Sequence, residues 1–206
     1  METDLPDQYA LFANAPFLPA GLRYAADFIS PDLERELIAY AAELPLQPFQ
    51  FGQYEGKRRV ASFGWQYDYT QRRLLPAEPI PGWLTAAIER VESFGGLGTR
   101  IDQVLCTEYE AGAGIGWHRD KPHFGRIFGL SLGSSCRLRF RRKAGEVWER
   151  AALDVAPRSI YEMSGSSRLE WEHSIPAVEA LRYSLTFRTL RGNVDDMSPN
   201  TRSAAQ

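Results

Sequence analysis

Hydrophobic residues recur at helical spacing in two segments of the chain. In residues 31–44 the apolar stripe consists of Leu33, Leu37, Ile38, Ala41 and Leu44. Ser30 suits the N-cap position and Pro31 the first helical position, while Pro45 stops the run. In residues 83–94 the stripe consists of Leu84, Ala87, Ile88 and Val91. We therefore predict helices over 31–44 and 83–94.

From residue 101 onward the pattern changes to short segments rich in β-branched and aromatic residues. Glycine, proline and serine clusters separate them, which is typical of strands. The predicted strands cover residues 101–109, 126–132, 137–142, 147–153, 159–163, 168–171 and 181–189. An aromatic alternation over residues 60–69 predicts an extra hairpin ahead of them. Helices followed by many short strands predict a mainly β, α+β fold: a sandwich or jelly roll with the N-terminal helices packed on one sheet.

Length and composition are those of a single globular domain. The chain has 206 residues, 44% of them hydrophobic and 24% charged, with a net charge of −2. This charge excludes a protein that coats nucleic acid by bulk attraction. There is neither a bilayer-spanning run nor a basic leader, and two cysteines fit a reducing compartment, so we expect a cytoplasmic protein away from membranes. No segment beyond the core offers an obvious exposed apolar patch, so we expect a monomer. Residues 192–206 are predicted to be a disordered tail.

Three residues have the types and spacing of an iron site. His118 and Asp120 are two apart, so on a strand they point to one face, and His173 follows in a later strand or its exit. Two imidazoles and one carboxylate form the facial triad that holds Fe(II) and leaves one side open. The alternative is a set of ordinary surface and core histidines. His123 follows a proline in a loop and is not expected to be a ligand.

Two arginines mark one face of the last predicted strand. Arg182 and Arg188 lie six residues apart, about 20 Å at the strand rise. Only Ser184 and Thr186 stand between them, so both cations are able to lean toward one dicarboxylate. The alternative is two solvated arginines on an exposed face.

These residues belong to an ordered set of motifs that resembles a known family. The segment Tyr109–Lys121 (YEAGAGIGWHRDK) is similar to the metal-binding segment of the AlkB family of Fe(II)/2-oxoglutarate dioxygenases. The later motifs are SLG at 131–133, SRL at 167–169 with His173, and RYSLTFR at 182–188, in the family's order. The resemblance extends from Tyr109 to Arg188 and is fainter in the N-terminal half.

The resemblance implies a double-stranded β-helix over about 100–190 and a nucleotide-recognition lid over about 50–75, within one domain spanning 1–206. The implied cofactors are Fe(II), 2-oxoglutarate and O₂, and the implied iron ligands are His118, Asp120 and His173. Arg182, assisted by the Tyr109 hydroxyl, would bind the distal carboxylate of 2-oxoglutarate, and Arg188 would lie near the carboxylate that chelates iron.

Two single positions and one tripeptide depart from the family pattern. Thr107 and Ser184 replace two asparagines at the cofactor, and both keep hydrogen-bonding capacity. After the metal ligands, Lys121-Pro122-His123 replaces the acidic residues that DNA-repairing bacterial members place against the target base. The base specificity is therefore open.

Two basic, aromatic segments are candidates for substrate binding. In the lid, aromatics alternate behind a pair of arginines, and the candidates are Arg59, Phe63, Trp65 and Tyr67. Such residues suit a stacked, flipped base with its phosphates held by arginine. The alternative is that the aromatics pack the helices onto the sheet. Arg139 and Arg141 belong to a row of like charges on one strand face, which either contacts phosphates or guards a sheet edge.

The leading hypothesis is oxidative demethylation of N-alkylated bases in DNA or RNA, single-stranded or flipped, with release of formaldehyde, succinate and CO₂. The lid sequence also looks like that of the family's tRNA wobble-uridine-modifying members, so tRNA hydroxylation is the closest alternative. A protein or small-molecule hydroxylase, a zinc hydrolase and a non-catalytic jelly-roll binding module are further alternatives. The zinc hydrolase leaves the arginine face unexplained.

Overall fold

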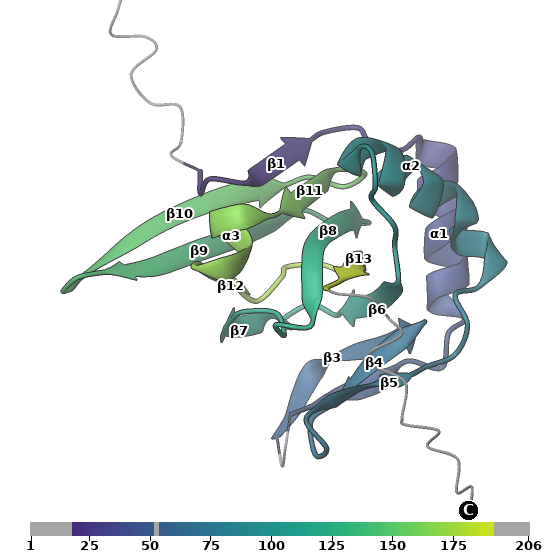
Figure 1. Ribbon diagram of the computed structural model, residues 1–206. Coiled ribbons are helices and arrows are strands. Elements are labelled where there is room, and N and C mark those ends of the chain that lie inside the picture. Colours follow the sequence, from purple (N-terminus) through teal and green to yellow (C-terminus); the bar gives the residue numbers. More distant parts are fainter. Residues whose placement is uncertain (1–17, 52–53, 192–206) are drawn as a thin grey trace, which may run out of the picture.

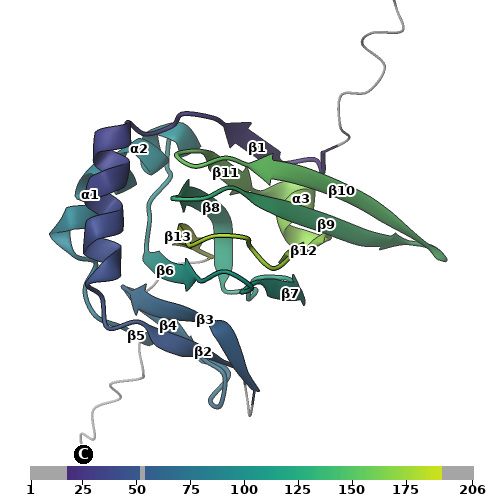
Figure 2. The ribbon, with the colours of Figure 1, turned by 180° about the vertical axis from the view of Figure 1, so that it is seen from behind.

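The computed structural model describes residues 18–51 and 54–191, which form two facing β-sheets with helices on one side (Figures 1 and 2). In spatial order the larger sheet contains β1 (Leu22–Ala25), β11 (Ile160–Met163), β8 (Phe124–Leu132), β13 (Arg182–Leu190), β6 (Gln103–Tyr109), β3 (Tyr54–Phe63) and β2 (Gln47–Phe51). The smaller sheet contains β10 (Val147–Val155), β9 (Cys136–Ala144), β12 (Glu172–Ile175) and β7 (Ile115–His118). The strands pair antiparallel, and the predicted jelly-roll fold is confirmed.

The helices cover the outer face of the larger sheet (Figure 1). They are α1 (Pro31–Ala42) and α2 (Thr85–Gly95), the latter preceded by the short 3-10 helix η2 (Gly82–Leu84). Leu37 and Val91 are fully buried and belong to one core with Leu185 and Phe187 of β13. The Ser30 hydroxyl accepts a hydrogen bond from the backbone N–H of Leu33 at 3.2 Å, as an N-cap does. Both predicted helices are confirmed.

A second core fills the space between the two sheets. Leu138 and Phe140 of β9 are fully buried there, in one cluster with Phe124 and Ile127 of β8. The alternation along β9 therefore turns its leucine and phenylalanine inward and Arg137, Arg139 and Arg141 outward.

The predicted strand over 168–171 is wrong. Residues Gly165–Leu169 form a short helix, α3, and strand β12 begins at Glu172. The Ser167 hydroxyl accepts a hydrogen bond from the backbone N–H of Ser164 at 3.1 Å, which closes the first turn of this helix. Periodicity over four residues does not separate a helical turn from a strand, whereas the serine cap does.

The predicted hairpin over 60–69 is divided between two sheets. β3 ends at Phe63, and β4 (Trp65–Asp68) instead pairs with β5 (Arg73–Pro76). Gly64 makes the break at a φ of +77°, and a Cβ there would lie 2.3 Å from the carbonyl oxygen of Asp102. Only glycine tolerates both conditions, so the chain leaves the larger sheet at this residue.

The predicted tail over 192–206 lies outside the described residues. None of the helices in the described parts of the chain combines the length and the apolarity that a membrane span needs.

Candidate active site

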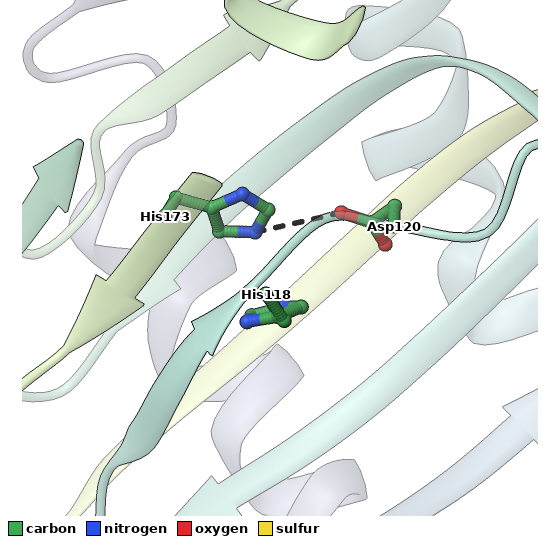
Figure 3. Close-up of side chains that lie close together, drawn as sticks. All are labelled: His118, Asp120 and His173. Atoms are coloured by element: carbon green, nitrogen blue, oxygen red, sulfur yellow. Dashed lines mark ion pairs between the residues drawn. The ribbon is translucent and has the colours of Figure 1, made fainter. Parts of the chain in front are cut away.

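Two strands of the smaller sheet bring the three candidate ligands together (Figure 3). His118 ends β7 and is the register partner of His173 on β12, and Asp120 follows β7 directly. The two imidazole centroids are 4.2 Å apart. One ligand atom from each of the three residues lies within 4.8 Å of the others. This spacing allows all three side chains to reach one metal ion.

Neighbouring groups orient each ligand. Nδ1 of His118 lies 2.9 Å from the carbonyl oxygen of Gly116. Because a carbonyl oxygen only accepts, Nδ1 carries the proton and donates it, which leaves the lone pair of Nε2 free for a metal. Oδ1 of Asp120 accepts from Nε and Nη2 of Arg188, at 3.0 and 2.7 Å. Its other oxygen, Oδ2, lies 3.5 Å from Nε2 of His173. One carboxylate oxygen is thus held by the arginine while the other faces the histidines.

The site favours the protonation states that a metal requires. Burial, and after it the nearby His118, lower the pKa of His173 to about 3. Burial also lowers the pKa of His118. Burial by itself would raise the pKa of Asp120, but Arg188 and then His173 hold it well below its usual range. At neutral pH the cluster therefore presents two neutral imidazoles and one carboxylate, a donor set suited to Fe(II).

Arg182 is a buried cation whose two terminal nitrogens lack hydrogen-bond partners among the described residues. Its side chain is fully buried, and Nε donates to the hydroxyl of Ser131 at 3.0 Å. Nη1 and Nη2 have no hydrogen-bond partner among the described residues. The guanidinium carbon lies 5.2 Å from the ring centroid of Tyr109. An unpaired buried guanidinium is costly, and a carboxylate with two oxygens would satisfy both nitrogens.

The remaining predicted cofactor residues surround this cation or lie farther along β13. Thr107 of β6 is the register partner of Ser184 of β13, and both are buried. Arg188, at the far end of the same strand face, donates to Asp120 and, through Nη1 at 2.8 Å, to Gln103. The predicted neighbour of the cofactor carboxylate is thus bonded to a metal ligand. Gln103, its other anchor, carried no signal in the sequence.

A family model described as the 2OG-Fe(II) oxygenase superfamily matches residues 21–191. The chain belongs to this superfamily. As a member it is an Fe(II)- and 2-oxoglutarate-dependent dioxygenase that uses O₂, and the triad and the unpaired guanidinium fit these groups. His118, Asp120 and His173 would hold the iron, and Arg182 the distal carboxylate of 2-oxoglutarate.

The oxygenase is AlkB-like, as the motifs predict. It is 30% identical over 202 residues to a tRNA (carboxymethyluridine(34)-5-O)-methyltransferase alkbh8 from Xenopus tropicalis, covering 92% of this chain and 31% of that protein. It is 28% identical over 155 residues to the alpha-ketoglutarate-dependent dioxygenase alkB homolog 3 from Homo sapiens, covering 66% and 53%. The chain thus spans about a third of the first relative and about half of the second.

Solved structures share the fold of the oxygenase. The structure of OsALKBH1 superimposes with a TM-score of 0.62 at 18% identity, over 84% of this chain and 98% of that one. A Pseudomonas putida prolyl-4-hydroxylase gives 0.57 at 20% identity, over 83% and 93%. At these identities the likeness concerns the fold alone.

In the segment predicted to be a lid, about residues 50–75, two of the predicted substrate residues face away from the triad. Arg59 donates through Nε to Glu108 at 2.7 Å, and Glu108 also accepts from the hydroxyl of Tyr183. Phe63 is buried in the core beneath the helices. The structure therefore does not bring Arg59 or Phe63 to the metal site, since residues of one parity on β3 face the helix side.

The neighbouring arginine occupies the position toward the site. Burial lowers the pKa of Arg58, whose charge interacts with Tyr109, Tyr69 and Arg188. Its guanidinium carbon lies 3.8 Å from the ring centroid of Phe49. Because side chains alternate along a strand, Arg58 and Phe63 of β3 face opposite sides of the sheet. The sequence shows this alternation, but which side faces the metal site follows only from the pairing of β3 with β6.

A cluster of rings and cations lies beside the triad, and the predicted Tyr67 belongs to it. Tyr67 and Tyr69 contact each other edge to face at 5.1 Å, and Tyr67 lies 5.6 Å from His123. The ammonium of Lys121 lies 4.7 Å from the ring of Tyr67 and 4.6 Å from that of Tyr69. Trp65 packs partly buried against the core between the sheets. We call Arg58, Tyr67, Tyr69, Lys121 and His123 the lid cluster.

Arg139 and Arg141 point to the outer face of the smaller sheet. Their neighbours on β9, Leu138 and Phe140, fill the inner core, on the same side as the register partner His173. The structure therefore does not bring these two arginines together with the triad. Their predicted role in substrate binding stays a prediction.

Arg168 fixes the position of the segment that carries Lys121 of the lid cluster. Its guanidinium donates to the backbone carbonyls of Lys121, Phe124 and Gly125 at 2.6, 2.9 and 3.1 Å. Its side chain is buried, and three carbonyl acceptors match its fork of donors. The motif at 167–169 thus positions the loop that follows Asp120.

Proposed function

We propose that this oxygenase removes N-alkyl groups from bases in DNA or RNA. The observation that carries the proposal is the lid cluster beside the triad. Tyr67 and Tyr69 supply aromatic rings against which a base that has left its stack can pack, with Lys121 beside them, and Arg58 supplies a cation for its phosphate. The similarity to an alkB homolog 3 dioxygenase supports the same activity.

When bound, Fe(II) and 2-oxoglutarate supply an O₂-dependent oxidation that yields succinate and CO₂ and adds one oxygen atom to a substrate C–H bond. Asp120 and the two histidines would hold the iron. Because their pKa values are lowered, they are already deprotonated at neutral pH and would release no proton when the iron binds. Arg182 would orient the cofactor through its distal carboxylate. An N-hydroxymethyl base then loses formaldehyde and returns to the unmodified base.

The charge of the lid cluster favours neutral alkylated bases. N1-methyladenine and N3-methylcytosine are cationic, whereas N1-methylguanine and N3-methylthymine are neutral. A base beside Tyr67 and Tyr69 would meet the ammonium of Lys121, and the charge of Arg58 acts on Tyr69 as well. Like charges repel at this range, so the two neutral lesions are the preferred substrates.

The test is mass spectrometry of DNA and RNA oligonucleotides carrying each of the four lesions, incubated with Fe(II), 2-oxoglutarate and O₂. We expect loss of the methyl mass, fastest for the neutral lesions, and no loss with His118→Ala. Lys121→Glu should shift the neutral-to-cationic rate ratio by about tenfold toward cationic bases, since a reversed charge changes such an interaction by about 1.4 kcal/mol or more. Lys57→Glu, an equal charge change at an exposed residue, should leave the ratio unchanged.

A second candidate is hydroxylation of a modified uridine in tRNA. The observation that favours it is the 30% identity to the tRNA (carboxymethyluridine(34)-5-O)-methyltransferase over 92% of this chain. In the same assay, tRNA would gain the mass of one oxygen, and methylated oligonucleotides would be unchanged. Conversion of 2-oxoglutarate to succinate without any change in nucleic acid would overturn both candidates and favour a protein or small-molecule hydroxylase. Failure to bind 2-oxoglutarate in a metal-dependent way would favour a binding module.

A further inference from the structure

The outer face of the smaller sheet carries a ladder of alternating indole and guanidinium groups. The guanidinium carbon of Arg141 lies 4.5 Å from the ring of Trp117 and 4.7 Å from that of Trp148. The guanidinium of Arg139 lies 5.2 Å from Trp117. Trp148 is 43% exposed, which is unusual for the largest apolar side chain. The metal site lies on the opposite face of the same strands.

This face carries more positive charge than its own carboxylates balance. Arg150 is the register partner of Arg141, a like-charge pair across β10 and β9. Glu172 pairs with Arg141 at 2.7 Å, whereas Arg139 bonds only to the hydroxyl of Ser174. Arg150 has no ion-pair or hydrogen-bond partner among the residues described. Opposed like charges destabilise a sheet, so an anion on this face would relieve a cost.

A groove of about 410 Å³ connects this face with the metal-binding segment. Arg142, Lys143, Trp148 and Glu172 line it from the sheet, together with Leu169 and Glu170, and Arg119, directly after β7, lines it as well. Arg119 stands between two metal ligands in the chain, and its Nη1 donates to the carbonyl of Leu169 at 3.4 Å. The β9–β10 hairpin that bears Trp148 extends outward from the body (Figures 1 and 2). A chain that leaves the metal site past Arg119 would therefore meet this face next.

We infer that the ladder of Trp117, Arg139, Arg141, Trp148 and Arg150 binds a single-stranded stretch of nucleic acid outside the target nucleotide. Bases stack on the exposed indole, and phosphates meet the unbalanced guanidinium groups. The inference rests on the proposed function in that the substrate is nucleic acid. Guarding of the edge strand β10 would explain the cations, but it needs no exposed tryptophan. An acidic peptide would satisfy the charges but leave the ladder's stacking surface unused.

Binding is measured by fluorescence anisotropy of an unmodified single-stranded twelve-nucleotide DNA or RNA. Trp148→Ala should weaken binding by about fivefold to a hundredfold, as removal of one stacking platform does. Arg150→Gln should weaken it by a smaller factor and lower the salt dependence by about one counterion. Both residues are exposed, so neither change should impair folding. Tyr40→Ala and Arg90→Gln, at exposed positions on the helix layer, are the matched controls and should bind as the parent does.

A second arm separates this inference from the proposed function. On a methylated nucleoside monophosphate, which has no strand outside the target nucleotide, Trp148→Ala should keep the parent's kcat/KM, whereas on a methylated twelve-nucleotide strand it should lose at least about fivefold. Equal loss on both substrates, or on neither, overturns the inference while demethylation stands. Ladder-dependent strand binding without any oxidation would overturn the proposed function and leave the ladder as a binding site. Failure of the unmodified strand to bind, together with binding of an acidic peptide that Trp148→Ala weakens, would assign the ladder to a protein partner and overturn the inference.

Discussion

Strand β13 has two buried faces built from opposite chemistry. Toward the helices, Leu185 and Phe187 are fully buried among apolar neighbours. Toward the smaller sheet, Arg182 is equally buried, yet two of its nitrogens have no partner among the described residues. Arg188, on that same face, is by contrast fully engaged with Asp120 and Gln103.

The apolar face of β13 stabilises the fold, whereas the polar face keeps a cation in place for a ligand. Apolar burial lowers the free energy of the folded chain without any ligand. An unpaired buried cation raises it, and well-packed apolar residues in its place are often neutral or stabilising. The free-energy cost of the buried Arg182 cation is therefore offset only when a ligand binds to it. Mutations on the two faces should have different effects: on stability at the apolar face and on ligand binding at the polar face.

The largest effect is expected at the metal ligands. His118→Ala should abolish turnover, because two remaining ligands do not form the triad. The same change should leave the thermal unfolding midpoint within a few degrees of the parent's in metal-free buffer, since His118 is only half-buried. Succinate release measures turnover, and a thermal melt measures stability. Normal turnover of His118→Ala would show that His118 is not a metal ligand.

Removal of the unpaired guanidinium should separate function from stability most sharply. Arg182→Met should raise the dissociation constant for 2-oxoglutarate by about thirtyfold or more, the usual cost of truncating a buried charge partner. Stability without cofactor should be unchanged or higher. Calorimetric titration and urea unfolding provide the readouts, with Arg137→Met, an exposed arginine paired with Asp154, as the control. Lower stability with unchanged affinity would contradict the assigned role.

The helix-side face should show the reverse. Leu185→Ala removes a fully buried side chain next to the helices, so the free energy of unfolding should fall by about 2–5 kcal/mol. The 2-oxoglutarate affinity of the folded fraction should stay within about twofold of the parent's, because distant sites with no shared partner are nearly independent. A large affinity change would show that the two faces are coupled.

The smallest effect concerns pH. Burial lowers the pKa of His173 from 6.5 to about 3, so between these values the unfolded chain binds a proton that the folded one does not. The free energy of unfolding of the metal-free protein should therefore fall as the pH drops below about 6.5, by at most about 1.4 kcal/mol per pH unit for this group. Urea unfolding from about pH 7 to about pH 5 measures it. His173→Gln should lose part of the slope, whereas Leu185→Ala should keep it.

Much of the architecture was predictable from local patterns. The helix stripes beginning at Leu33 and Leu84, and the alternation along β13, determine which residues face a core, because side-chain direction follows from backbone geometry alone. The polar residues of the triad and both arginines of β13 were visible as motifs. Their lack of apolar character at positions that alternate with a core indicated a functional face.

What escaped prediction depends on how segments pair. The short helix α3 covers only five residues, too few for periodicity to distinguish a helix from a strand, and its serine cap decides its conformation. The choice between Arg58 and Arg59 depends on which face of β3 meets the helices, and that follows from the pairing of β3 with β6. Gly64 then sends the aromatics after it into another sheet.

The sequence by itself determined the composition of each strand face and the identity of the metal ligands. Only the tertiary structure decided that His118 pairs with His173, that Arg182 keeps two nitrogens without a partner among the described residues, and that Trp148 joins Arg141 on the outer face. The physical reason is that a face is a property of a few consecutive residues. Register, burial and stacking arise between residues far apart in the chain, whose meeting depends on every loop between them.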